Sequence, residues 1–335
     1  MTQDIPAGDV LRAPKRSERL RQRAAWMYFV EEMTQSAIAE ALGVGRVTVV
    51  RMLAEAKALG EVRIALSRGD AELGGLEAAL CRLYGFSEAI VAPLSSATAD
   101  PTAPIGAALG DHVSALLRND MKIGLGWGRT LNRSLEYLRE RSLRGLSVVS
   151  LVGGVTRFAQ DNPAEFPSAF AHAFNADCYL IPAPALVDSA ATKAALIQRC
   201  GLGEVYDFAE GLDAVVVSVG SLGSEAAIAR FALIGEADRK ALREYGGVGE
   251  MLCNVFDREG RIVEHPLNQR VMSVPIESVR AAPIRVLAAG GAHKQGAIAG
   301  AIKLLEPTTL VTDAATARRL SADVVVERGK SKLSP

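Results

Sequence analysis

Cysteine is scarce in this 335-residue sequence, and its few copies lie far apart. The four cysteines, Cys81, Cys178, Cys200 and Cys253, form no C-x-x-C pair and have no histidine at metal-ligand spacing. A disulfide framework or a structural zinc site needs such clustering. We therefore expect reduced thiols and no bound metal.

Long apolar segments are also missing. No apolar run reaches the ~20 residues that a helix needs to cross a bilayer. The first ten residues are polar and carry two acids, unlike a secretory signal peptide. Aromatic residues make up only 5% of the chain, whereas hydrophobic residues make up 49%, a balance typical of soluble α/β proteins rich in Ala, Val and Leu. We expect a cytoplasmic protein with no membrane partner.

The sequence has no net charge, with 38 basic and 38 acidic residues, but the charge is unevenly distributed. Residues 1–69 hold 11 basic and 8 acidic side chains, so the remainder is slightly acidic. Six basic residues and one acid lie between Arg12 and Arg23. This stretch is either an arm that follows DNA phosphates or a solvated tail.

The segment Thr34–Gly60 has the pattern of a helix-turn-helix. Thr34 suits the N-cap of a first helix, and the small Ala39 allows a second helix to approach. Gly43 provides the backbone conformation that a tight turn needs. The apolar residues that would fill the angle between the helices are Leu42, Val44, Val49 and Met52. A helix over residues 17–31 would support the pair.

The second helix, over residues 45–59, exposes basic side chains. Arginine is the commonest reader of guanine in the major groove, which favours DNA over a protein partner for this unit. The DNA-binding residues that we predict are Thr34, Gln35, Ser36, Arg46, Thr48 and Arg51.

Glycines near residues 69–75 mark a domain boundary. We predict a flexible basic arm over residues 1–16, a helix-turn-helix domain over residues 17–67 and an effector-binding domain over residues 68–335. Apolar strands alternate with amphipathic helices in the last of these, which predicts a mainly parallel α/β sheet covered on both faces. The expected strands cover residues 89–92, 121–125, 146–152, 178–181, 214–219, 284–289 and 310–311. An antiparallel hairpin is expected over residues 251–263, with its turn at Asp257–Gly260.

Three of the predicted strands end in glycine-rich loops, at Gly126–Thr130, Gly153–Thr156 and Gly290–Lys294. Bare backbone N–H groups beside a hydroxyl or a cation suit a phosphate, although glycine also makes ordinary βα turns. None of the loops matches a P-loop, and Leu131 replaces the third glycine of a dinucleotide site. We therefore expect no nucleotide cofactor. Trp127 is either a wall of the pocket or ordinary loop packing.

Catalytic groups are few. His112, His172 and His265 stand alone, whereas His293 lies in a glycine-rich loop. The carboxylates nearest strand ends, which suit hydrogen bonds to sugar hydroxyls, are Asp188, Glu250, Asp257 and Asp313. No paired acid and base is evident, so we predict no catalytic residues and no enzyme activity.

Several motifs in this order resemble the SorC family of bacterial sugar-responsive transcriptional regulators. They are IGLGWGRTL at Ile123–Leu131, VSLVGGVT at Val149–Thr156, LIPAP at Leu180–Pro184, VVVSVGS at Val215–Ser221, FDREGRIV at Phe256–Val263, LNQRV at Leu267–Val271, AAGGAHKQGAIAGAIK at Ala288–Lys303 and LVTDAATAR at Leu310–Arg318. The family commonly has Ser where Gly45 opens the second helix here, so this N-cap is expected to be weaker.

The resemblance implies a large domain similar to phosphosugar isomerases of the NagB/RpiA type that has given up catalysis. It implies a homo-dimer or homo-tetramer on operator DNA that responds to a phosphorylated sugar or a polyol-derived metabolite. The effector contacts that it implies are Gly126, Gly128, Arg129, Thr130, Gly154, Thr156, Gly220, Asp257 and Lys294, to which we add Trp127. We predict a repressor of a carbohydrate or polyol catabolic operon. The alternative is a phosphosugar isomerase-like enzyme with an accessory DNA-binding domain.

Overall fold

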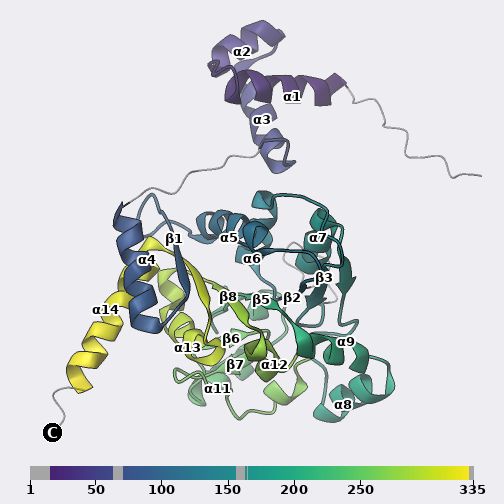
Figure 1. The fold of residues 1–335 in the computed structure, drawn as a ribbon, viewed down its shortest axis with the longest axis vertical. Coiled ribbons are helices and arrows are strands. Elements are labelled where there is room, and N and C mark those ends of the chain that lie inside the picture. Colours follow the sequence, from purple (N-terminus) through teal and green to yellow (C-terminus); the bar gives the residue numbers. More distant parts are fainter. Residues whose placement is uncertain (1–15, 63–70, 156–162, 164, 332–335) are drawn as a thin grey trace, which may run out of the picture. The chain divides into compact units, whose positions relative to one another are not determined.

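The computed structural model describes residues 16–62, 71–155, 163 and 165–331, the last eight of them without their side chains (Figure 1). The chain divides into two compact units, Met1–Arg68 and Gly69–Pro335, and each has its own hydrophobic core. The basic arm predicted over residues 1–16 lies almost entirely outside the described residues. None of the helices in the described part of the chain is long and apolar enough to span a bilayer.

The first unit consists of three helices, α1 (Arg16–Phe29), α2 (Gln35–Leu42) and α3 (Arg46–Ala58). Ile38 and Val49 are fully buried where α2 meets α3. The predicted apolar set is confirmed, because Leu42, Val44 and Met52 pack against the same core. Small residues such as Ala24 and Ala56 allow α1 and α3 to approach closely.

The second unit is built on a seven-stranded sheet in which all pairs of neighbouring strands are parallel, in the order β1-β9-β8-β5-β2-β3-β4. This confirms the predicted mainly parallel sheet. The strands are β1 (Glu88–Ala92), β2 (Lys122–Leu125), β3 (Ser147–Ser150), β4 (Asp177–Tyr179), β5 (Ala214–Val217), β8 (Ile284–Ala288) and β9 (Thr309–Asp313).

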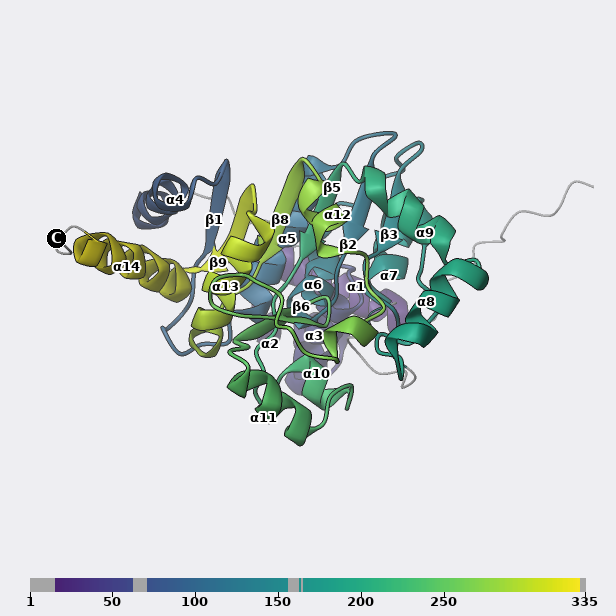
Figure 2. The same ribbon diagram turned by 90° about the horizontal axis from the view of Figure 1, so that it is seen from below.

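Both faces of the sheet are covered (Figure 2). Alternate residues of each central strand enter opposite cores: Val216 packs with α5, α6 and α7, whereas Val215 and Val217 pack on the other face, where α4 and α13 also contribute side chains. This alternation follows from the period of two of a β-strand. The helices of this unit are α4 (Ala71–Tyr84), α5 (Thr102–Leu116), α6 (Arg129–Ser134), α7 (Glu165–Phe174), α8 (Ala190–Arg199), α9 (Gly203–Phe208), α10 (Ala227–Arg230), α11 (Glu236–Glu244), α12 (Ile276–Ala281), α13 (Gln295–Leu305) and α14 (Ala314–Ser331).

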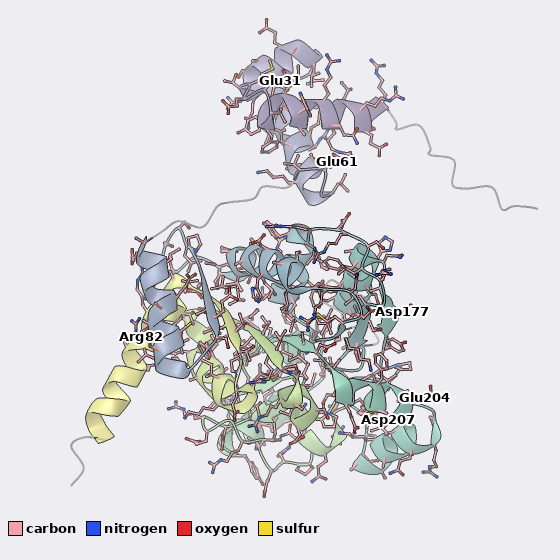
Figure 3. The ribbon with its side chains drawn as sticks, in the orientation of Figure 1. Glu31, Glu61, Arg82, Asp177, Glu204 and Asp207 are labelled. Carbon is pink, nitrogen blue, oxygen red and sulfur yellow. The ribbon has the colours of Figure 1, made fainter. Side chains whose placement is uncertain are left out.

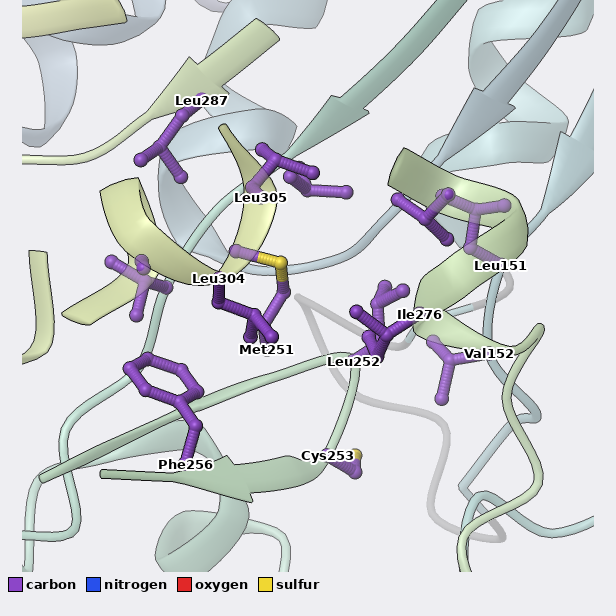
Figure 4. Close-up of a cluster of buried hydrophobic side chains, with 14 of the residues drawn as sticks. Leu151, Val152, Met251, Leu252, Cys253, Phe256, Ile276, Leu287, Leu304 and Leu305 are labelled. Atoms are coloured by element: carbon purple, nitrogen blue, oxygen red, sulfur yellow. The ribbon is translucent and has the colours of Figure 1, made fainter. Parts of the chain in front are cut away.

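The predicted hairpin is misplaced. Its two strands are β6 (Gly249–Met251) and β7 (Asn254–Phe256), and they turn at Leu252 and Cys253 rather than at Asp257–Gly260. Both turn residues have positive φ, 53° and 65°, which usually calls for Asn or Gly. Here both side chains are buried in the core (Figure 4), so packing decides the residue type.

The turn predicted at Asp257–Gly260 also exists, but it follows β7. Gly260 N donates to the Asp257 carbonyl at 3.1 Å, and a single bridge joins Phe256 to Ile262 beyond it. The prediction for β4 needs a correction as well. It is an edge strand with three exposed residues, beginning at Asp177 (Figure 3), and the buried Ile181 follows it.

Candidate functional site

The strand order places a crevice at the carboxyl ends of β2 and β5. From β2 the chain proceeds to β3 and β4 on one side, and then returns to β5 on the other side. The loops that leave two such neighbouring strands diverge, and ligands of open α/β sheets bind at this point. A cavity lies here, lined by residues that follow β2, β5 and β8 and by parts of three further segments. They are Thr102, Trp127, Gly128, Arg129, Thr130, Ser218, Val219, Gly220, Ser221, Glu225, Ala226, Ala227, Arg230, Glu250, His293 and Lys294.

Four basic residues line this cavity, and three of them follow β2 or β8. Arg129 is the first residue of α6, and His293 and Lys294 immediately precede α13. Burial lowers the pKa of Lys294; the charge of Arg129 lowers it further, whereas Glu250 opposes this change. The pKa of His293 is lowered first by burial and then by Lys294 and Arg129. Because these cations disfavour one another, a bound anion would relieve their repulsion.

Glu250 is a buried carboxyl group in the same cavity, with 4% of its surface exposed. Its Oε2 accepts a hydrogen bond from Cys253 N at 2.9 Å, and its backbone pairs with Gly220 in both directions. A Cβ at position 220 would lie 2.1 Å from Glu250 Oε1, so a larger residue there would displace this carboxyl group. Burial raises the pKa of Glu250 to about 7, against the opposing effects of Cys253 N–H and Lys294. Near neutral pH this group can therefore donate or accept a hydrogen bond.

The described part of the first unit has the geometry of a helix-turn-helix. Thr34 Oγ1 accepts a hydrogen bond from Ala37 N at 3.2 Å and caps α2. Gly43 ends α2 with φ of 64°, a left-handed conformation that favours glycine. Gly45 stands at the N-cap of α3 and makes no side-chain cap, as its lack of a hydroxyl predicts.

Four of the six predicted DNA-binding residues surround one surface hollow. Thr34, Gln35 and Ser36 come from the start of α2, and Arg46 comes from the start of α3. Arg51 is exposed one turn further along α3, whereas Thr48 is half-buried. The start of α2 and the first turns of α3 thus form one candidate nucleic-acid interface.

One residue of the basic stretch has a structural role instead. Arg21 is buried, and its guanidinium bonds to Glu55 at 2.9 Å and twice to Glu61 at 2.7 Å. Glu61, labelled in Figure 3, follows the end of α3. The hydrogen bonds with Arg21 lower the pKa of Glu61. Arg21 therefore joins α1 to the end of α3, and Arg16, Arg19 and Arg23 are the described arginines of this stretch that remain exposed.

Comparisons with known proteins identify this architecture. The sequence pattern of the sugar-binding domain family Sugar-bind matches residues 71–321. The full-length sorbitol operon regulator SorC from Klebsiella pneumoniae has a similar structure, with a TM-score of 0.68 and 27% identity over 90% of this chain and 98% of that one. The chain belongs to the SorC family of sugar-binding transcriptional regulators.

The names of two further relatives of this SorC-family chain state a pathway or a class of compound. The erythritol catabolism regulatory protein EryD of Brucella abortus is 31% identical over 310 residues, 90% of this chain and 96% of EryD. The deoxyribonucleoside regulator of Bacillus subtilis is 27% identical over 312 residues, 92% of this chain and 99% of that protein. Both alignments include nearly the whole of each protein.

The structure brings together six of the predicted effector residues of this SorC-family chain around the cavity: Trp127, Gly128, Arg129, Thr130, Gly220 and Lys294. Trp127 fits both of the interpretations that its sequence allowed, because it lines the cavity and also packs against Phe231 at 5.8 Å between ring centroids. Of the four carboxylates proposed for hydroxyl groups, Glu250 is the one that lines the cavity.

Three further predicted effector residues, Gly126, Gly154 and Asp257, do not line the cavity. Gly126 follows β2 and packs beside Val217, and Gly154 pairs with the loop at Pro184. The Asp257 carboxylate accepts hydrogen bonds from Arg261 and Glu259 within its own turn. Thr156 lies outside the described residues, so its predicted contact stays a prediction.

Several cavity residues were not predicted. Ser218 and Ser221 belong to the motif VVVSVGS without being predicted contacts, and Thr102, Glu225 and Arg230 have no signal in the sequence. Thr102 begins α5, and Glu225 and Arg230 belong to the long connection after β5. No glycine-rich loop or regular spacing marks these positions, and tertiary folding alone brings them to the cavity.

Proposed function

We propose that this protein is a one-component transcriptional repressor of a carbohydrate or polyol catabolic operon. In this proposal residues 17–67 bind operator DNA in the cytoplasm, residues 68–335 bind a phosphorylated sugar or polyol, and the basic arm contributes to DNA contact. The observation that carries the proposal is one cavity at the β2/β5 crevice that combines Arg129 and Lys294 with the buried Glu250.

The effector fits this cavity through two kinds of group. Arg129 and Lys294 are placed to bind a phosphate by charge-assisted hydrogen bonds, assisted by Gly128 and Thr130. Glu250 would hydrogen-bond a hydroxyl group of the same molecule, because it lines the same cavity as Arg129 and Lys294. The names of the relatives direct the first choice of effector toward phosphorylated erythritol, sorbitol and deoxyribose.

The DNA side of the proposal uses the exposed surface of α2 and α3. Thr34, Gln35 and Ser36 lie where phosphates are contacted in a helix-turn-helix, and Arg46, Thr48 and Arg51 lie on the helix that enters the major groove. A single unit of this size contacts one half-site. We therefore propose at least a homo-dimer, with half-sites spaced by whole helical turns.

Replacing Lys294 or Arg129 by alanine should weaken effector binding tenfold to a hundredfold. Each change removes a charge-assisted hydrogen bond to the phosphate, worth about 1.5–3 kcal/mol. The measurement is isothermal titration calorimetry of the full-length protein with phosphorylated erythritol, sorbitol and deoxyribose, each compared with its unphosphorylated form. Lys303→Ala is the matched control, because this lysine is exposed on α13 and does not line the cavity.

Unchanged affinity in both variants would mean that these loops are ordinary βα turns. The same titrations separate the proposal from the enzyme alternative, which the raised pKa of Glu250 favours because acid–base groups often have such values. A regulator should return each sugar phosphate unchanged, as judged by NMR of the mixture. Isomerised product, lost in Glu250→Gln, would establish the enzyme instead.

A further inference from the structure

Among the large hydrophobic residues that the structure describes as exposed, Val47 has the highest exposed fraction. Its side chain is 83% exposed, and Val50 on the next turn is 46% exposed. The opposite side of α3 carries the core, with Val49 and Leu53 buried. An isolated exposed valine is ordinary, but two on one face of a candidate DNA-reading helix form a small apolar surface.

This apolar surface is placed where a helix-turn-helix contacts bases. Val47 is the second residue of α3, and the first residues of the second helix are those that reach base edges in the major groove. Arg51 lies four residues after Val47 and is exposed on the same face. Arg46 precedes Val47 and is also exposed. The two arginines would hold the apolar surface against DNA.

Neither packing nor helix propensity explains a valine at this position. An 83% exposed side chain gains little from burial within the protein. Valine is also a weaker helix former than Ala, Lys or Glu, because its branched side chain loses rotamer freedom. An apolar contact with a binding partner would explain the valine, because it would bury the exposed side chain.

We propose that Val47 is a specificity-determining residue that recognises the C5-methyl group of a thymine in each operator half-site. This inference rests on the proposed DNA-binding function. In the major groove thymine presents a methyl group, whereas cytosine presents an amino donor. The valine methyls can cover the thymine methyl, but they would leave the cytosine donor without a hydrogen-bond partner, which costs free energy. Val47 therefore selects T over C at one position, with Val50 beside it.

The test begins with selection of an operator from random duplex DNA by the full-length protein. Each thymine of the selected operator is then replaced in turn by deoxyuridine, which lacks only the C5-methyl group. For the natural protein, one replacement per half-site should weaken binding about fourfold, the change that burial of one methyl group provides. In Val47→Ala the same replacement should have a clearly smaller effect, because the two γ-methyl groups that cover the thymine methyl are gone.

Leu59→Ala is the matched control, since Leu59 is 58% exposed at the other end of α3. It should respond to every deoxyuridine as the natural protein does. The inference is overturned if Val47→Ala keeps the same deoxyuridine profile as the natural protein, or if the natural protein is indifferent to every replacement. Thermal unfolding of each variant establishes that it is folded. A selection that yields no preferred sequence would instead overturn the proposed DNA-binding function, and this inference with it.

Discussion

Glu250 is a buried acid in a cavity that also holds Arg129 and Lys294. Burial raises the pKa of its carboxyl group from 4.5 to about 7. The folded protein therefore keeps this proton over a pH range in which the unfolded chain has released it. By linkage, the contribution of Glu250 to stability falls as the pH rises from about 4.5 to about 7.

Glu250→Gln should remove this dependence. The variant and the natural protein should differ little in free energy of unfolding near pH 4.5, and the variant should become the more stable one above pH 7. The difference should be at most on the order of 3 kcal/mol, because each pH unit between the two pKa values corresponds to about 1.4 kcal/mol. Urea unfolding at a series of pH values measures it.

Glu264→Gln provides the control, because Glu264 is exposed on the surface. It should follow the natural protein at every pH. Parallel stability curves for Glu250→Gln and the natural protein would show that Glu250 has an ordinary carboxyl pKa.

Some residues of the cavity could be predicted from the sequence, and others could not. Arg129 and Lys294 were identifiable because each follows a strand and a glycine turn, which is a local pattern. Glu250 was one of four equivalent carboxylates, since its burial depends on contacts with Gly220 and Cys253. Asp257 had the same local appearance, yet its carboxylate serves its own turn.

At the scale of elements, the caps of the first unit differ in quality. The Thr34 hydroxyl caps α2, whereas Gly45 provides α3 with no side-chain cap. Thr34 also borders the hollow where DNA phosphates are proposed to bind. The stability of α2 and its placement on DNA therefore depend on the same residue.

Thr34→Ala should destabilise α2 by about 1 kcal/mol, a typical cost of losing a threonine cap. A loss of about 1 kcal/mol raises the population of the locally opened helix roughly fivefold. In the full-length protein, amide hydrogens of α2 that exchange through this opening should therefore exchange roughly fivefold faster. Thr34→Ser keeps the oxygen and should exchange like the natural protein. Equal rates in all three proteins would indicate that the hydrogen bond to Ala37 does not stabilise the helix.

Elements set by local chemistry were predicted, and those set by tertiary contacts were not. The strands β2 and β5 follow from apolar runs, and the helix-turn-helix follows from a cap, a glycine and periodic apolar residues. The turn at Leu252–Cys253 has none of the usual turn residues, because both side chains fill the core (Figure 4). The exposed edge of β4 likewise depends on strand order, which no local pattern specifies.

At the scale of the whole molecule, regulation requires free-energy coupling between effector and operator binding. A ligand changes operator affinity only if it binds the two states of the protein with different affinity. By thermodynamic reciprocity, the factor by which the effector changes operator affinity equals the factor by which the operator changes effector affinity. This equality holds for any path of coupling between Met1–Arg68 and Gly69–Pro335.

We expect saturating effector to weaken operator binding by roughly 5-fold to 150-fold, the range of a coupling of about 1–3 kcal/mol. Fluorescence anisotropy with labelled operator measures one factor, and calorimetry of the effector with and without operator measures the other. Lys294→Ala should bind operator normally without effector and respond only at much higher effector concentrations, whereas Lys303→Ala should respond normally. An effector that binds tightly while operator affinity stays constant would contradict a regulatory role for this cavity. Unequal factors would mean that the two measurements report different assemblies of the protein.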